Sequence, residues 1–365
     1  MPKPLQYARL SLREVITLPL ILLGLPFALV GTLLSIPWSA KLKDKPWRRV
    51  VVESTFRYVS YLTTAQAQKL SGTTSATYRK AVAKYGLDPV VEEIGEAAQL
   101  FWLGEKRSDY VLLYIHGGAF WAPLLEPSID CWRYVQQKLK ARTNSHNVGV
   151  AILKYSLWPE ATFPTPLCQT ALAINHLLAS GVHPSNLQLV GDSAGANIIT
   201  QVLFHILHPL DGVPSVKLSS PISGAFMISP WASLSANSPS RAKNHPFDVV
   251  TATKLRSWGD SILADVPAPL RSYIEAADAP EAWFDGIDRV VDRIFITAGG
   301  LECLRDDIVR FAEKLKTRHP RVELVVQRGG VHDDMIMDFT AGLPEDQLGE
   351  LWPICIQWFA AGFEE

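Results

Sequence analysis

Short apolar segments alternate with longer segments of helical periodicity beyond residue 50 of this 365-residue chain. This alternation is typical of a mostly parallel sheet covered by helices on both faces, and we predict one α/β domain. The expected strands span residues 110–115, 148–154, 187–190, 225–229, 293–297 and 323–327, and the expected crossover helices span residues 165–179, 194–207 and 306–317.

Two segments depart from this pattern and are expected to form a helical cap. Residues 46–100 precede the regular alternation, and residues 231–288 place Ser, Asn, Pro and Ala between occasional aromatic residues. Insertions of this length usually carry function or their own helices. Open α/β sheets bind ligands at the carboxyl ends of their strands, so the cap is expected there. We therefore assign residues 46–365 to the α/β domain and residues 1–45 to an N-terminal anchor.

The N-terminal segment contains a long run without charges, residues 15–40. Because roughly 20 apolar residues span a bilayer, we predict a single-pass membrane anchor at residues 15–38. The run is too long for a cleaved signal peptide, so the anchor is expected to stay attached, with the endoplasmic reticulum as its location. More Lys and Arg follow the run than precede it, which mildly favours a cytosolic body, but the topology stays open.

The composition disfavours two classes of protein. Thirty-five basic and 36 acidic residues give a net charge of -1, so no strong field attracts nucleic acid. The four cysteines lie too far apart for a disulfide scaffold or for the close pairs of a zinc site. We read them as buried thiols, and the oligomeric state is not indicated.

The most informative motif is Gly191-Asp-Ser-Ala-Gly195, which falls between an expected strand and an expected helix. A sharp strand-to-helix turn in this context exposes its serine above the sheet as a nucleophile. The two glycines remove side chains that would clash at so tight a bend. The motif therefore predicts Ser193 as a nucleophile.

A second glycine motif, His116-Gly-Gly-Ala-Phe120, directly follows the strand at 110–115. Backbone N–H groups in such a loop can hold the negative oxygen of a tetrahedral intermediate. We predict Gly117, Gly118 and Ala194 as the donors of this oxyanion hole. His116 precedes the turn and is expected to brace the loop.

A serine hydroxyl is a weak nucleophile until a neighbouring imidazole takes its proton. His332 follows the last expected strand on a glycine loop, at the sheet edge where Ser193 is expected. His319 ends a helix just before a strand, which places it at the opposite edge. His332 is therefore the predicted base.

A carboxylate should fix the tautomer of that imidazole. Glu302 lies nearest the end of the strand at 293–297, whereas Asp306 falls where a helix N-terminus uses acids for capping. We predict Glu302 and keep Asp306 as the alternative acid. The order serine, acid, histidine is that of α/β-hydrolases.

Taken in order, these motifs resemble the hormone-sensitive-lipase-like branch of the α/β-hydrolase superfamily, and more closely its fungal membrane-anchored esterases and steryl acetyl hydrolases. The similarity covers about residues 105 to 362. Its motifs are Tyr114-Ile-His-Gly-Gly-Ala-Phe-Trp121, Lys154-Tyr-Ser-Leu-Trp-Pro-Glu-Ala-Thr-Phe-Pro164, Gly191-Asp-Ser-Ala-Gly195, Ser229-Pro-Trp231, Leu304-Arg-Asp306 and Gly330-Val-His332-Asp333. Two positions depart from the pattern: Glu302 aligns with the family's aspartate, and Ala119 replaces its third oxyanion glycine.

The resemblance implies hydrolysis of carboxylic esters through an acyl-enzyme, without metal or cofactor. An apolar cap and a membrane anchor suggest a small lipophilic ester, such as an acetylated sterol or secondary metabolite. A thioester, lactone or amide could replace the ester, since the same groups serve all acyl transfers. The fold also hosts non-catalytic small-molecule-binding proteins that lack the histidine, and the presence of His332 argues against that alternative.

Overall fold

A computed structural model describes residues 6–39, 42–43, 45–142 and 148–363. Its centre is a single sheet in the order β1-β2-β4-β3-β5-β6-β7-β8. β1 and β2 form an antiparallel hairpin whose second strand pairs antiparallel with β4, and all other neighbours are parallel. The strands are β1 (Val90–Gly95), β2 (Ala98–Trp102), β3 (Tyr110–Ile115), β4 (Val148–Lys154), β5 (Leu187–Asp192), β6 (Gly224–Ile228), β7 (Ile294–Gly299) and β8 (Val322–Gln327).

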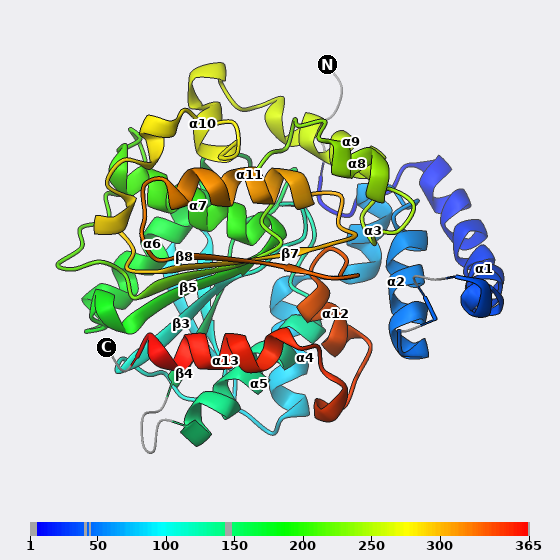
Figure 1. Cartoon of the computed structure of the whole chain (residues 1–365), viewed down its shortest axis with the longest axis horizontal. Coiled ribbons are helices and arrows are strands. Elements are labelled where there is room, and N and C mark those ends of the chain that lie inside the picture. The colour runs from blue at the N-terminus through cyan, green and yellow to red at the C-terminus, as the bar shows by residue number, and fades with distance from the viewer. Residues whose placement is uncertain (1–5, 40–41, 44, 143–147, 364–365) are drawn as a thin grey trace.

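Helices cover both faces of the sheet (Figure 1). α6 (Thr165–Ala179), α7 (Ser193–Leu207) and α11 (Arg305–Lys316) lie on one face. α4 (Thr74–Lys84), α5 (Glu126–Arg142) and α13 (Leu351–Ala361) lie on the other. The predicted mostly parallel α/β architecture is therefore confirmed, and each expected strand and crossover helix is present with its ends moved by at most two residues.

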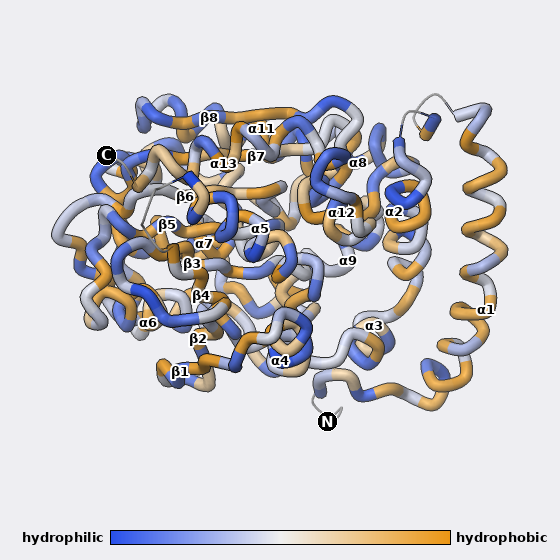
Figure 2. The backbone as a smooth tube through the Cα atoms, turned by 90° about the horizontal axis from the view of Figure 1, so that it is seen from below, coloured by the Kyte–Doolittle hydropathy of each residue, from blue (hydrophilic) through white to orange (hydrophobic). Residues whose placement is uncertain are grey.

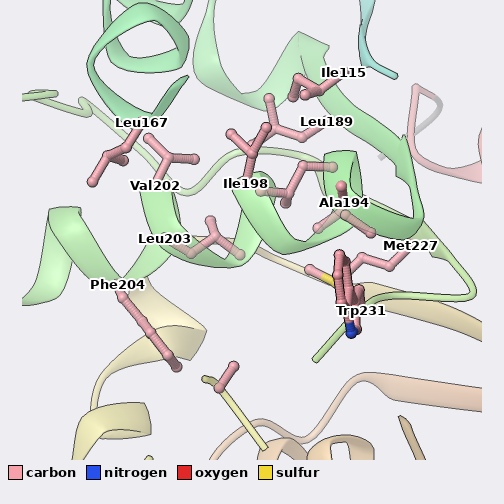
Figure 3. Close-up of a cluster of buried hydrophobic side chains, with 14 of the residues drawn as sticks. Ile115, Leu167, Leu189, Ala194, Ile198, Val202, Leu203, Phe204, Met227 and Trp231 are labelled. Atoms are coloured by element: carbon pink, nitrogen blue, oxygen red, sulfur yellow. The ribbon is translucent and has the colours of Figure 1, made fainter. Parts of the chain in front are cut away.

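The core beneath α7 fixes the helix that begins at Ser193. Ile198 and Val202 of α7 lie beside Leu189 of β5 and Leu167 of α6 (Figure 3), and all four side chains are buried. Every residue of α7 from Ser193 to His205 is buried. A helix enclosed in this way cannot tilt without opening voids, so its first residue is held firmly against the sheet.

The predicted cap segment 46–100 divides into two parts. Its first part forms α2 (Trp47–Val59), α3 (Thr64–Ser71) and α4, whereas its last part is the β1–β2 hairpin of the main sheet. Leu100 and Trp102 of this hairpin are fully buried, and pairing β2 with β4 provides that burial. Only the helical part of the segment is therefore available to a cap.

The second predicted cap segment, 231–288, is helical. It contains α8 (Pro239–Asn244), α9 (Ala252–Leu263) and α10 (Arg271–Ile274), of which α10 packs on α7. α12 (Asp334–Thr340) follows His332, and the short 3₁₀ turns are η1 (Ile36–Trp38), η2 (Pro184–Asn186), η3 (Ala268–Leu270), η4 (Glu281–Phe284), η5 (Ile287–Arg289) and η6 (Glu345–Gln347).

α1 (Leu12–Ser35), continued by η1, is long and apolar enough to cross a membrane. None of its residues is buried, and it runs along α2 and α3 at the edge of the body (Figure 2). The hydroxyl of Tyr58 donates to the carbonyl of Ile21 at 2.8 Å, and the amide of Gln66 donates to the carbonyl of Glu14 at 2.8 Å. Of the predicted anchor segment 1–45, residues 1–5, 40–41 and 44 lie outside the described residues.

α2 is fastened to the body by a buried arginine. Arg49 donates to Asp334 at 2.6 Å and to Glu53 at 3.1 Å, and also pairs with Asp338. Breaking such a buried pair leaves uncompensated charge and typically costs about 3–5 kcal/mol. The contact therefore fixes this helix on α12, the helix that follows His332.

Candidate active site

Ser193 stands at the junction of β5 and α7 in the left-handed region, with φ of 48°. The flanking glycines make this turn possible. A Cβ atom at residue 195 would lie 1.9 Å from the carbonyl oxygen of Ile115, and one at residue 191 would lie 2.9 Å from the backbone of the following turn. The sharp strand-to-helix turn that the motif predicts is therefore present.

An unbroken chain of hydrogen bonds joins the three predicted side chains. Oγ of Ser193 lies 2.9 Å from Nε2 of His332, and Nδ1 of His332 lies 2.6 Å from Oε1 of Glu302. All three residues are buried, with Glu302 fully enclosed. Because Nδ1 faces a carboxylate and carries the proton, Nε2 is left to exchange a proton with the serine.

The second oxygen of Glu302 is also fixed. Oε2 accepts from the hydroxyl of Ser229 at 2.9 Å and from the N–H of Gly299 at 2.8 Å. The alternative acid, Asp306, has other partners: it accepts from the N–H of Ser240 at 2.8 Å and pairs with Arg305 at 2.7 Å. The structure thus brings Glu302, and not Asp306, to the imidazole.

The predicted oxyanion set needs one correction, at Gly117. Its N–H donates to Oδ1 of Asp192 at 3.0 Å, and that oxygen also accepts from the hydroxyl of Tyr114 at 2.6 Å. An N–H has one hydrogen to give, so Gly117 is not available as an oxyanion donor. Asp192 instead ties the glycine loop to the turn that carries Ser193.

The N–H groups of Gly118, Ala119 and Ala194 have no acceptor among the described residues. Gly118 and Ala119 follow Gly117 with φ of 105° and 50°, and Ala194 is in the first turn of α7, where N–H groups have no helical partner. Ala119, which stands where the family has its third oxyanion glycine, is therefore a candidate donor beside Gly118 and Ala194.

Asp248, from the insertion, was not predicted from the sequence. Its Oδ1 accepts from the N–H of His332 at 2.8 Å, and its Oδ2 accepts from the N–H of Cys303 at 2.7 Å. Burial raises the pKa of Asp248 to about 6. No motif surrounds this residue, and its role follows only from the folded position of the insertion.

A further carboxyl group adjoins the imidazole. Oδ2 of Asp333 lies 3.3 Å from Nε2 of His332. Burial alone would lower the pKa of His332, but Asp333, Glu302 and Asp248 raise it to about 10. Burial also raises the pKa of Asp333 well above its usual range. These neighbouring carboxyl groups therefore favour the protonated form of His332, in the direction of a raised pKa.

The other histidines weighed from the sequence lie away from this chain of hydrogen bonds. Nδ1 of His116 lies 2.7 Å from the carbonyl of Gly117, and its ring stacks on Tyr155, as expected of a residue that braces the loop. His319 contacts the carbonyl of Val291 at 2.8 Å, before β7 begins. Within the described ranges no cluster of His, Cys, Asp and Glu has the arrangement of a metal site.

Ser193 and His332 open into a pocket beneath α2, α3 and α9. Aromatic and aliphatic side chains from these helices and from the carboxyl edge of the sheet line much of it. They include Phe56, Leu62, Trp121, Trp231, Leu255 and Trp258. The helical parts of both predicted cap segments thus contribute to the walls, and a pocket of this kind suits an apolar ligand.

A family model described as the alpha/beta hydrolase fold matches residues 112–336. The chain belongs to this family. The predicted superfamily is confirmed. This α/β-hydrolase is also similar to the crystal structure of an esterase from the bacterial hormone-sensitive lipase family, with a TM-score of 0.62 and 23% identity over 88% of this chain and 97% of that one.

Curated relatives of this α/β-hydrolase include two bacterial proteins. An esterase of Acinetobacter venetianus is 25% identical over 242 residues, 66% of this chain and 72% of the relative. An acetyl-hydrolase of Streptomyces hygroscopicus is 29% identical over 175 residues, 47% of this chain and 54% of the relative. A fungal structure, carboxyl esterase 2 of Tuber melanosporum, has a TM-score of 0.57 at 17% identity and covers 76% of this chain and 86% of its own.

The charges around His332 predict a pH dependence. A base must be neutral to accept a proton, so activity should rise with pH as the imidazolium is lost. Asp333→Asn removes the negative charge nearest Nε2, which lowers the pKa of His332 and moves the acidic limb of kcat/KM to lower pH. Glu302, Asp248 and Asp192 remain as the other carboxyl groups around the ring.

The measurement is the pH profile of kcat/KM for p-nitrophenyl butyrate, beside the exposed control Asp346→Asn. The control should keep the parent profile. An unchanged acidic limb in Asp333→Asn would mean that the Asp333 carboxyl is already neutral over the working range.

Proposed function

We propose that this α/β-hydrolase hydrolyses carboxylic esters, with Ser193 as nucleophile, His332 as proton carrier and Glu302 as the group that orients His332. The observation that carries the proposal is the hydrogen-bond chain from Glu302 through His332 to Ser193 at an apolar pocket. The esterase and acetyl-hydrolase relatives support the same reaction.

In the first half of the reaction, Oγ of Ser193 attacks the ester carbonyl while Nε2 of His332 takes its proton. The carbonyl oxygen becomes negative and is held by the N–H groups of Gly118, Ala119 and Ala194. Removing one such donor in a serine hydrolase typically costs ~10²–10³ in rate. The carbon–oxygen bond to the alcohol then breaks, and Nε2 gives its proton to the leaving oxygen.

In the second half, water attacks the acyl group on Ser193 and gives a proton to His332. The serine oxygen leaves with that proton, and the carboxylic acid is released. Glu302 stays ionised throughout and stabilises the imidazolium, as its three buried hydrogen bonds with His332, Ser229 and Gly299 favour.

The proposed substrates are small lipophilic esters, with a short acyl group and a sterol or another apolar alcohol. The apolar walls formed by α2, α3 and α9 support a lipophilic ligand. An acetyl-hydrolase among the relatives supports a short acyl chain. Hydrolysis of thioesters, lactones and amides would use the same nucleophile and oxyanion hole. Measuring kcat/KM for one substrate of each kind ranks these classes against esters.

We also propose that α1 attaches the chain to a membrane as a single-pass anchor of the endoplasmic reticulum, with residues 46–365 as the hydrolase domain. The large apolar side chains of α1 support this, since Leu20, Leu23 and Phe27 are 63%, 67% and 80% exposed. Each would be stabilised by roughly 1.5–3 kcal/mol on leaving water.

Loss of the nucleophile tests the reaction. Ser193→Ala should abolish hydrolysis of p-nitrophenyl acetate and butyrate, because it removes the hydroxyl that contacts Nε2 of His332. A fluorophosphonate probe should label the parent chain on the peptide that contains Ser193, as read by mass spectrometry. A mutant as active as the parent, or an unlabelled parent that still binds apolar ligands, would point to a binding protein.

The acid is tested by a matched pair. Glu302→Gln should lower kcat by several orders of magnitude, because the amide no longer stabilises the imidazolium and leaves a buried network mismatched. Asp306→Asn should stay within a few-fold of the parent, since this residue contacts only Arg305 and Ser240 among the described side chains. The reverse ranking would transfer the role to Asp306.

The anchor is tested on the exposed side of α1. Leu20→Arg combined with Leu23→Arg and Phe27→Arg should release the chain from membranes that retain the parent through an alkaline carbonate wash. Leu70→Arg and Ile354→Arg are matched controls, because both side chains are about half exposed outside α1. A parent chain found in the supernatant would contradict the anchor.

A further inference from the structure

The carboxyl group of Asp333 lies beside the hydrogen-bond chain without being a member of it. Its Oδ2 lies 3.3 Å from Nε2 of His332, the nitrogen that faces Ser193. Its Oδ1 is buried and has no hydrogen-bond partner in the part of the chain that the structure describes. A buried carboxyl oxygen in this state is stabilised by a group that reaches it and donates a hydrogen bond to it.

The backbone holds this carboxyl group in place. Asp333 has φ of 53° and ψ of 37°, and its N–H donates to the hydroxyl of Ser229 at 3.1 Å. The same hydroxyl donates to Glu302. A left-handed residue at the start of α12 is strained for most side chains, and Asp and Asn tolerate it best after glycine. The position is therefore fixed by the network that fixes the acid.

Among the residues that line the pocket, Oδ1 of Asp333 is one of the few buried polar atoms that have no hydrogen-bond partner in the described ranges. Asp333 lines the pocket together with apolar side chains such as Val249 and Leu255 and polar ones such as Ser60 and Ser128. Other buried polar atoms of the lining without a partner are Nε2 of His116 and Nε1 of Trp121 and Trp231. The two indole groups are donors only, and His116 belongs to the glycine loop.

We propose that Asp333 is a specificity-determining residue that accepts a hydrogen bond from a hydroxyl group on the alcohol part of the substrate. This proposal rests on the proposed ester hydrolysis. The leaving oxygen receives its proton from Nε2 of His332, so it lies within hydrogen-bond reach of that nitrogen. Because the Asp333 carboxyl adjoins the same nitrogen, it would lie next to the leaving alcohol.

The geometry selects a chemical class. A hydroxyl on the carbon next to the one that carries the ester oxygen projects towards an acceptor beside the leaving oxygen. The preferred substrates are therefore monoesters of vicinal diols, with the rest of the alcohol or acyl chain apolar. An alcohol of the same size without the hydroxyl offers the Asp333 carboxyl group no donor in the complex, which is how a hydrogen-bonding site rejects such analogues.

Three butyrate esters of similar size test the class on the full-length parent chain. The 2-hydroxyethyl ester carries the donor, the propyl ester replaces the hydroxyl by methyl, and the 2-methoxyethyl ester keeps the electron-withdrawing oxygen but cannot donate. Release of butyric acid by pH-stat titration gives kcat/KM for each. The 2-hydroxyethyl ester should exceed both others by about tenfold or more, as a hydrogen bond to a carboxylate provides.

Two substitutions separate the hydrogen bond from the charge, and both suit the left-handed backbone. Asp333→Asn keeps an acceptor and should keep the preference for the 2-hydroxyethyl ester. Asp333→Gly removes the acceptor and should bring the three esters within about twofold of one another, because a change in the pKa of His332 affects all three alike and cancels in their ratio. Fluorophosphonate labelling of Ser193 in each variant checks that the site is intact.

The outcomes are distinct. Equal rates on the three esters in the parent chain, or a 2-methoxyethyl ester as good as the 2-hydroxyethyl ester, would overturn the role of Asp333 while ester hydrolysis stands. A preference that survives in Asp333→Gly would also overturn it. If Asp333→Gly is not labelled by the fluorophosphonate probe, its site is not intact, and the rates of the parent chain on the three esters decide the question. If the parent chain hydrolysed none of the three esters faster than the Ser193→Ala variant does, the proposed function would be overturned as well.

Discussion

The site depends on the close approach of Gly195 to the carbonyl of Ile115. β3 and β5 are parallel neighbours with Ile115 opposite Gly191, so the loops that follow these strands leave the sheet side by side. A side chain at residue 195 would collide with that carbonyl and push the loops apart. Asp192 then joins the loops by accepting the N–H of Gly117. The serine and the candidate oxyanion donors are thus positioned by the sheet itself.

Glu302 and His332 lie on separate loops after β7 and β8, so a further contact is needed to hold these two loops together. Asp248 provides it by accepting one backbone N–H from each loop, at Cys303 and at His332. Ser229, after β6, joins them by contacting both Glu302 and the N–H of Asp333. Burying Asp248 is unfavourable for its charge, as the raised pKa shows, and its hydrogen bonds to the two loops offset that cost.

Much of this arrangement could be predicted from the sequence, because local motifs and strand order suffice for it. Ser193, Glu302 and His332 each follow a parallel strand, and parallel strands present their carboxyl ends at one edge. The role of Gly117 could not be predicted, since the direction of each N–H in a glycine loop depends on φ angles and on distant Asp192. Asp248 could not be found either, because it reaches the site only through the folded insertion.

The β1–β2 hairpin was missed for a related reason. Glu92 and Glu93 make its first strand read as surface loop, and only the edge position beside β2 accommodates them. The pattern of apolar residues predicts which side chains are buried, but not which other element of the fold they pack against. The hairpin became part of the sheet because Leu100 and Trp102 find their partners on β4, which is distant in the sequence.

α2 and α3 contact α1 on one side and line the pocket on the other, so the proposed membrane attachment and the pocket involve the same helices. If α1 spans a bilayer as proposed, it would have to part from α2, whose charged residues would otherwise enter the bilayer. The hydrogen bonds from Tyr58 and Gln66 to α1 are between neutral groups, worth about 0.5–1.5 kcal/mol each. The Arg49 network that holds α2 on α12 costs about 3–5 kcal/mol to break. In the proposed single-pass arrangement, α1 would part from α2 and α3, and the Arg49 network would keep α2 and its share of the pocket wall on the hydrolase domain.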